Sequence, residues 1–176
     1  MSRQEEDIFQ PAILTKRITL EMIVIDKFIQ NTLSDILKKE LEGKCCVEGY
    51  IKTDSIEVTS YSSGSIKGSN VVFDVAFQCL VCYPVEGMTL KVKAVSINTA
   101  GIKAESIYYA TNGQSIASGG IIPTPYVLFI SRNHHQDNDI FNSIQMNETF
   151  TARVIVQRFE LNDKYISIIG EIVSKP

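Results

Sequence analysis

The sequence predicts an α+β protein in which a mixed N-terminal lobe is followed by a small β-barrel. Ile, Val and Thr make up 49 of the 176 residues, whereas Leu occurs nine times. This bias favours strands, because β-branched side chains pack well on a pleated surface. One stretch carries apolar residues at helical spacing, and most others alternate with a period of two. The last five alternating segments are short and fall within about 90 residues, which is typical of a barrel.

Residues 1–85 are predicted to form the mixed lobe, beginning with a polar tail over residues 1–12. A strand is expected over residues 15–25, because apolar side chains recur there at every second position. Met22 and Val24 are expected on the apolar face of this strand.

One helix is predicted over residues 28–42, where six apolar residues recur at helical spacing. Gly43 stands where a glycine cap would end this helix. Three strands are predicted after it, over residues 45–52, 55–61 and 70–83. The serine- and glycine-rich stretch 62–69 is predicted to be an exposed loop between the last two.

Residues 86–176 are predicted to form a five-stranded OB barrel. The expected strands cover residues 88–97, 102–107, 126–130, 150–159 and 165–173. A Gly/Ser-rich excursion covers residues 111–124, and one long connection separates the third strand from the fourth. Five short strands with a long connection are typical of this fold.

The charge distribution argues against a generic polyanion binder, since the net charge is −3 and the pI is about 5.4. Residues 1–84 carry 9 basic and 12 acidic side chains, whereas residues 85–176 carry 8 of each. The second half is therefore the better candidate for contact with a polyanion.

The sequence predicts neither a membrane span nor a signal peptide. Its longest apolar stretch, residues 71–85, is interrupted by Asp74 and Gln78 and is shorter than the ~20 residues that a membrane helix needs. The first seven residues contain three acids and no apolar run. We therefore expect an intracellular chain with reduced thiols and no membrane partner.

The cysteines have the spacing of half a zinc site, but their geometry argues against metal binding. Cys79 and Cys82 lie three apart in a predicted strand, so their side chains should point to opposite faces. Cys45 and Cys46 are adjacent and should also diverge. Buried, inert cysteines are therefore the preferred interpretation, with no metal and no cofactor.

The two histidines give little support for catalysis. His134 and His135 are followed by Asp137 and Asp139 in what is predicted to be a solvated loop. A metal enzyme or hydrolase would need all its groups from this one loop, and no nucleophile elbow, Walker loop or dinucleotide fingerprint is present. We therefore expect no catalytic residue.

The basic side chains of the second half suggest contact with RNA. OB barrels bind single strands on the face of their second and third strands, using cations for phosphates and rings for base stacking. The candidate RNA-binding residues are Lys91, Lys93, Lys103, Phe129, Arg132 and Arg153. The alternative is that they are ordinary solvated side chains on strand faces.

The order of these elements resembles the stalk subunit of multisubunit RNA polymerases, namely the seventh subunit of eukaryotic RNA polymerase II and its archaeal E-prime counterpart. A helix ends in Glu42-Gly43, a long strand ends in Tyr83-Pro84, and Glu86-Gly87 then opens the barrel. Further segments that carry the resemblance are residues 41–45, 73–87, 95–102 and 129–132. The resemblance covers about residues 13–173 through order, spacing and length.

The resemblance implies a non-catalytic subunit whose N-terminal tip domain docks beside the polymerase clamp. The docking candidates are Gly64, Ser65, Ile66, Lys67 and Gly68. The implied partners are the large core subunits, a small helical stalk partner and, weakly, the nascent RNA near its exit path. The implied location is with the transcription machinery: the nucleus for a eukaryotic gene, or the host cytoplasm and virion for a large DNA virus.

One departure weakens the expected RNA contact. Barrels of this type usually carry an aromatic residue two positions after the turn glycine of the second strand, where this chain has Ile102-Lys103-Ala104. Phe129 is the main ring left for stacking, and each lost ring forfeits ~1–3 kcal/mol. The rival interpretation is an OB-barrel RNA-binding module of translation or RNA decay that does not associate with polymerase.

Overall fold

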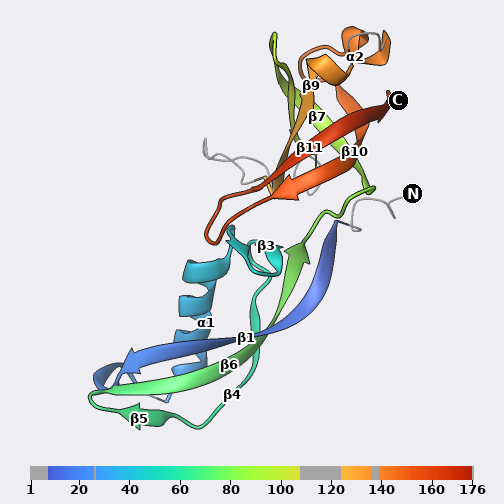
Figure 1. Cartoon of the computed structure of the whole chain (residues 1–176). Helices are drawn as coiled ribbons and strands as arrows, with labels where there is room; N and C mark the ends of the chain where they lie inside the picture. The colour runs from blue at the N-terminus through green and yellow to red at the C-terminus, as the bar shows by residue number, and fades with distance from the viewer. Residues whose placement is uncertain (1–7, 26, 108–123, 136–138, 176) are drawn as a thin grey trace.

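The computed structural model describes residues 8–25, 27–107, 124–135 and 139–175. It is a mixed α+β protein built mostly of strands, with a six-stranded sheet and a closed five-stranded barrel. The sheet and its helix lie at one end of an elongated molecule and the barrel lies at the other (Figure 1). The predicted α+β class and the five-stranded barrel are confirmed.

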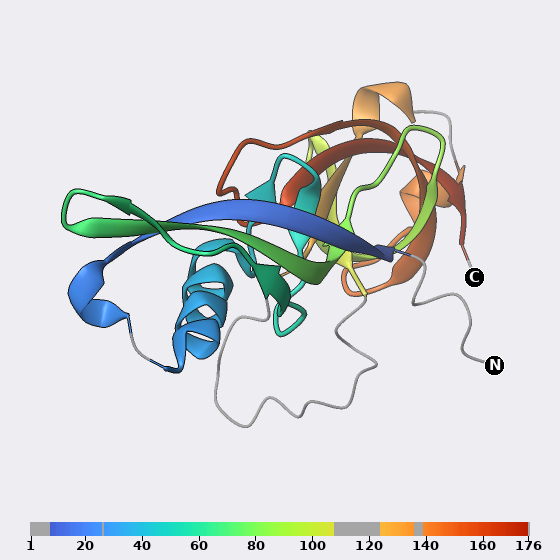
Figure 2. The same cartoon turned by 90° about the horizontal axis from the view of Figure 1, so that it is seen from below.

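The N-terminal lobe is organised around one long strand. Its elements are β1 (Phe9–Glu21), the 3-10 turn η1 (Met22–Val24), α1 (Ile29–Leu41), β2 (Cys45–Cys46), β3 (Gly49–Ile51), β4 (Glu57–Tyr61), β5 (Ser65–Lys67) and β6 (Asn70–Cys82). β6 pairs with β1 along its whole length, while β3, β4 and β5 pair with its other edge. Figure 2 shows β1 and β6 as one long twisted ribbon with α1 beside it.

α1 forms where the sequence predicts a helix. Leu33 and Leu37, four residues apart and therefore on the same face of the helix, are both fully buried in the core of the lobe. They share that core with Val75 and Phe77 on the inward face of β6. Gly43 follows the helix with a φ of +71°, the left-handed conformation that glycine supplies at a helix end.

The N-terminal strand differs from its prediction at both ends. β1 begins at Phe9, so the predicted polar tail over residues 1–12 is wrong from that residue onward. Pro11, which has no N–H to donate, is tolerated because β1 is an edge strand, with no second neighbour among the described strands that would require a donor at every position. At the other end the chain leaves the sheet as η1, so Met22 and Val24 are exposed instead of lying on a strand face.

The barrel closes in an order that is consistent with the predicted OB fold. Its elements are β7 (Thr89–Ile97), β8 (Gly101–Ser106), β9 (Tyr126–Ser131), η3 (Arg132–His134), α2 (Asp139–Ser143), β10 (Thr149–Arg158) and β11 (Ile166–Ser174). The strand order is β10-β11-β9-β8-β7, and β10 also pairs with β7 to close the ring. β9 and β11 are parallel and the other pairs are antiparallel. The excursion over residues 111–124 lies almost wholly outside the described residues.

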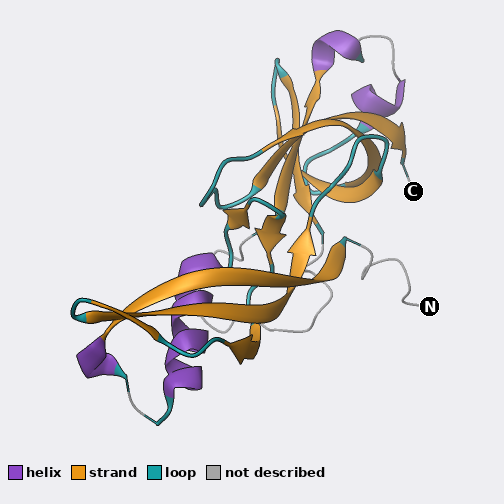
Figure 3. Cartoon of the chain, turned by 60° about the horizontal axis from the view of Figure 1, so that its bottom comes forward, coloured by secondary structure: helices purple, strands orange, loops and turns teal. Residues whose placement is uncertain are grey.

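The two lobes share a buried core at the place where the N-terminal sheet meets the barrel in Figure 3. Phe9, Cys45, Tyr50 and Cys82 belong to the N-terminal sheet but pack in the same buried cluster as the barrel strands. The β10–β11 turn adds two main-chain hydrogen bonds: Cys45 N–H donates to the Asp163 carbonyl at 2.8 Å, and Asn162 N–H donates to the Cys45 carbonyl at 2.9 Å. The junction is therefore a packed joint.

Gly101 should be the glycine of the barrel least tolerant of a side chain. Its φ is +156°, and a Cβ there would lie 2.0 Å from the Ile130 carbonyl oxygen. We expect Gly101→Ala to lower the free energy of unfolding by about 2–3 kcal/mol, because main chain must move to relieve the overlap. Urea unfolding followed by circular dichroism measures this. The control is Gly68→Ala, at a φ of +64° with open space around it, which should cost about 1 kcal/mol; equal losses would contradict the steric account.

Candidate functional site

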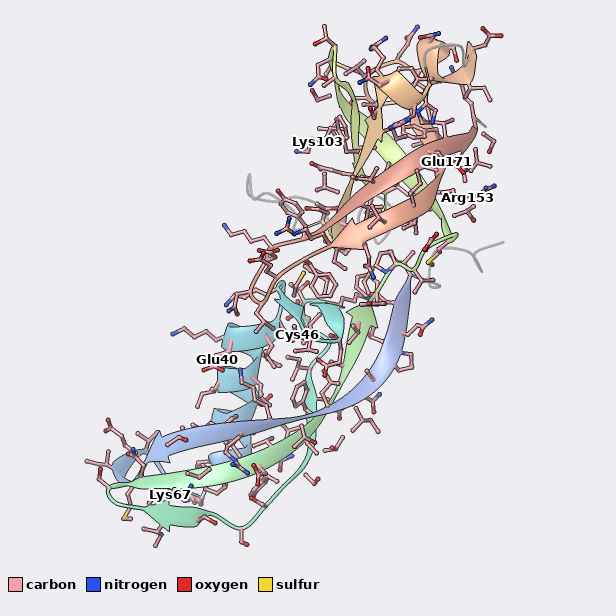
Figure 4. The ribbon with its side chains drawn as sticks, in the orientation of Figure 1. Glu40, Cys46, Lys67, Lys103, Arg153 and Glu171 are labelled. Atoms are coloured by element: carbon pink, nitrogen blue, oxygen red, sulfur yellow. The ribbon has the colours of Figure 1, made fainter. Side chains whose placement is uncertain are left out.

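The predicted docking segment lies at the end of the N-terminal lobe furthest from the barrel (Figures 1 and 4). It is a short hairpin and not the loop that the sequence predicted, because β5 pairs with the start of β6. Ile66 lies in β5 and is 71% exposed. Gly64 packs so closely that a Cβ would lie 2.4 Å from a Val71 methyl carbon, while Gly68, at a φ of +64°, forms the turn.

A second segment at the same end was missed by sequence reasoning. η1 follows β1, and Met22 N–H donates to the Ser69 carbonyl at 3.0 Å, which joins η1 to the β5–β6 turn. Ile23 is 89% exposed. We call the exposed apolar side chains of this end the distal patch: Met22, Ile23, Val24 and Ile66. In the sequence this segment is an uninterrupted apolar run. It was assigned to the predicted strand because its residues at every second position continue the alternating pattern of that strand.

The barrel brings two of the predicted RNA-binding residues together. Lys103 on β8 and Phe129 on β9 are direct cross-strand partners. The same row continues to Ile169 on β11 and Val156 on β10, which are each about half exposed. We call Lys103, Phe129, Ile169 and Val156 the barrel row. Its last two members could be found only once the strand register was known.

The other predicted RNA-binding residues do not join this row. Arg132 donates from Nη2 to the Asn98 carbonyl at 3.1 Å and lies 5.1 Å from the centre of the Phe141 ring. Arg153 forms an ion pair with Glu171 at 3.1 Å, on a different side of the barrel from Lys103 (Figure 4). Their cations are therefore engaged in intramolecular contacts.

The two remaining RNA-binding candidates lie on β7, and the acidic residue that partly neutralises the barrel row lies on the neighbouring strand β8. Lys91 and Lys93 are exposed on β7, and Lys93 lies opposite Glu105 of β8. Glu105 also lies 3.6 Å from the Lys103 ammonium. Positive charge on this side of the barrel is thus partly balanced, and any attraction for phosphate is weakened.

His135 corrects the prediction of a solvated histidine loop. It is buried and stacks on Phe141 with ring centres 5.5 Å apart. Its Nδ1 lies 2.9 Å from the Ser131 carbonyl, and Ile172 N–H donates to its Nε2 at 3.4 Å. This arrangement fits a neutral ring protonated on Nδ1 that ties the end of β9 to β11. Asp137 lies outside the described residues.

The cysteines divide between two cores. Cys79 packs in the core of the N-terminal lobe, whereas Cys82 and Cys45 pack at the junction. Burial raises the pKa of Cys45 and Cys82 to about 12 and that of Cys79 to about 11. Within the described ranges, no three His, Cys, Asp or Glu side chains are grouped to hold a metal ion.

These thiols should resist alkylation in the folded protein. The thiolate is the reactive form, and a raised pKa leaves almost none of it at pH 8. We expect iodoacetamide at pH 8 to leave Cys45, Cys79 and Cys82 unmodified until denaturant is added, as measured by peptide mass spectrometry. Rapid modification of any of the three without denaturant would contradict the buried, thiol-form assignment.

No protein-family model matches the sequence, and a search of curated proteins gives no match. No helix in the described part of the chain has the length and apolar character to cross a membrane. The distal patch and the barrel row are therefore the features from which function is inferred.

Proposed function

We propose that the chain is a non-catalytic stalk subunit of a multisubunit DNA-directed RNA polymerase. The observation that carries this proposal is the distal patch, which gathers exposed apolar side chains at the end of the N-terminal lobe furthest from the barrel. Several exposed apolar side chains gathered at one end of a protein are typical of an interaction site. In this proposal the N-terminal lobe is the tip domain, and the distal patch docks it on the large core subunits.

The barrel is proposed to lie near the exiting transcript and to contact it weakly. The barrel row offers one cation and one ring side by side, which is the minimum for phosphate attraction and base stacking. Only one aromatic ring stands in the row, and Glu105 reduces its positive charge. RNA contact is therefore expected to assist a complex that is held together by docking. A small helical partner remains part of this proposal.

The packed joint supports the same role. Main-chain hydrogen bonds and a common core hold the barrel against the N-terminal lobe, so docking at the far end would fix the position of the barrel. A non-catalytic subunit that positions RNA needs a barrel that is held in a fixed position relative to its docking surface. A flexible linker between the two lobes would leave the position of the barrel undefined.

Affinity purification from the native source tests the proposal directly. The chain carries a C-terminal tag, and co-purifying proteins and RNA are identified by mass spectrometry and sequencing. Recovery of the large polymerase subunits is the expected result. If RNA and translation or decay factors are recovered without any polymerase subunit, the proposal fails and the barrel row supports an RNA-binding module instead.

A further inference from the structure

An open cleft of about 640 Å³ lies between β1, the second half of α1 and the β10–β11 turn. Five consecutive residues of β1, 16–20, form one wall. Ile36, Lys39 and Glu40 of α1 form another, and Lys44 and Asn162 close the end nearest the barrel. Figure 4 shows Glu40 on α1, between the ribbon of β1 and the barrel.

The wall formed by β1 is the open edge of a sheet. Side chains of a strand point alternately to its two faces, so five consecutive lining residues mean that the cleft runs along the edge of the strand. Among the described strands, β1 pairs only with β6. Its other edge therefore presents main-chain donors and acceptors that an extended chain can pair with.

The cleft carries an excess of positive charge. Lys16, Arg17, Lys39 and Lys44 line it together with a single acid, Glu40. Lys16 lies 2.6 Å from Glu40, and Lys44 donates to main-chain carbonyls at the end of α1. Arg17 pairs with Asp74 outside the cleft. Within the described residues Lys39 forms no ion pair, so its ammonium is available to an incoming carboxylate.

The side chains that line the cleft also indicate whether it suits an acidic peptide or a nucleic acid. Its uncharged side chains are aliphatic or small and polar, namely Ile18, Thr19, Leu20, Ile36 and Asn162, with no aromatic ring. Single-stranded nucleic acids are bound by rings on which bases stack, so this cleft lacks the platform that they need. An aliphatic floor with a basic rim instead suits a peptide that alternates apolar and acidic side chains.

We propose that this cleft binds an extended acidic segment of a partner protein, which adds as a strand to the open edge of β1. Main-chain hydrogen bonds to β1 supply affinity, and the ammonium of Lys39, unpaired within the described residues, selects a carboxylate of the incoming segment. A second copy of the chain is a poorer occupant, because two basic edges would repel each other. The proposal does not depend on association with a polymerase.

The test uses the full chain and a fluorescein-labelled peptide of alternating glutamate and valine, followed by fluorescence anisotropy. We expect saturable binding, and about five- to tenfold weaker binding to Lys39→Glu. The matched control is Lys38→Glu, which makes the same change in the same helical turn but does not line the cleft. Its affinity should change by less than twofold.

A second peptide, N-methylated at alternate residues, separates strand addition from charge attraction. It keeps every carboxylate but cannot donate main-chain hydrogen bonds at the methylated positions. We expect it to lose binding, and we expect hydrogen exchange of residues 16–20 to slow only with the unmethylated peptide. Equal binding of both peptides, equal effects of the two lysine variants, or tighter binding of a single-stranded oligouridylate at this cleft would each overturn the proposal. So would light scattering that shows a dimer built on this edge.

Discussion

Ile23→Asp combined with Ile66→Asp should abolish co-purification of the chain with the large polymerase subunits. Both side chains lie in the distal patch and are 89% and 71% exposed, so they fill no core. Burying a carboxylate in an apolar interface costs several kcal/mol, and each lost apolar anchor at the centre of an interface adds ~2 kcal/mol. Together they should weaken docking by at least about a thousandfold, which immunoprecipitation followed by mass spectrometry would register as complete loss.

The matched control places the same charges on exposed isoleucines elsewhere. Ile13 of β1 is 73% exposed and Ile155 of β10 is about half exposed, and neither belongs to the distal patch. Ile13→Asp with Ile155→Asp should leave co-purification unchanged. Circular dichroism should show both double variants folded. Polymerase recovered with the distal variant would mean that docking uses another surface, whereas loss with both pairs would point to a general effect of added charge.

The elements that could be predicted from the sequence are those with a strong local pattern. α1 has helical spacing and a glycine cap, and β6 alternates over 13 residues, so both were found to within two residues. The five barrel strands also follow local alternation. In each case, burial of one face imposes a periodicity that can be read without knowing what packs against it.

The missed elements depend on a partner strand. The start of β1 contains a proline and does not alternate, and it is a strand because β6 is long enough to pair with it down to Phe9. β5 is only three residues long and is exposed throughout, so its sequence carries no apolar period. η1 forms where the chain passes the end of β6 and has no strand left to pair with, so the apolar side chains of η1 are exposed to solvent. Tertiary pairing overrides local pattern in all three.

The same difference between local pattern and pairing across strands explains which parts of the candidate sites could be predicted. Lys103 and Phe129 could be predicted because their strands could be recognised, but their direct pairing follows from the β8–β9 register. Ile169 and Val156 joined the barrel row only through that register. Arg153 was placed on the correct strand, yet its ion pair with Glu171 comes from the neighbouring strand β11. Residue type and strand position alone do not show which cations are already paired.

Tyr50→Ala should destabilise the barrel although Tyr50 belongs to the N-terminal sheet. Its side chain is fully buried in the cluster that includes the barrel core. Truncating a buried aromatic side chain costs about 3–5 kcal/mol, because apolar contacts are lost and a cavity remains. Since the cavity opens at the junction, hydrogen exchange should accelerate in the strands β7 and β10 as well as in β3.

Leu33→Ala provides the comparison that makes this result specific. Leu33 is also fully buried, but it packs in the separate core between α1 and the sheet. It should lower stability by about 2–5 kcal/mol and accelerate exchange in α1 before the barrel strands. If Tyr50→Ala left exchange in β7 and β10 unchanged, the two lobes would be independent and the packed joint would not hold them as a unit. If the barrel responds as expected, a subunit docked through its distal patch also fixes the position of its barrel, which is what the proposed stalk function requires.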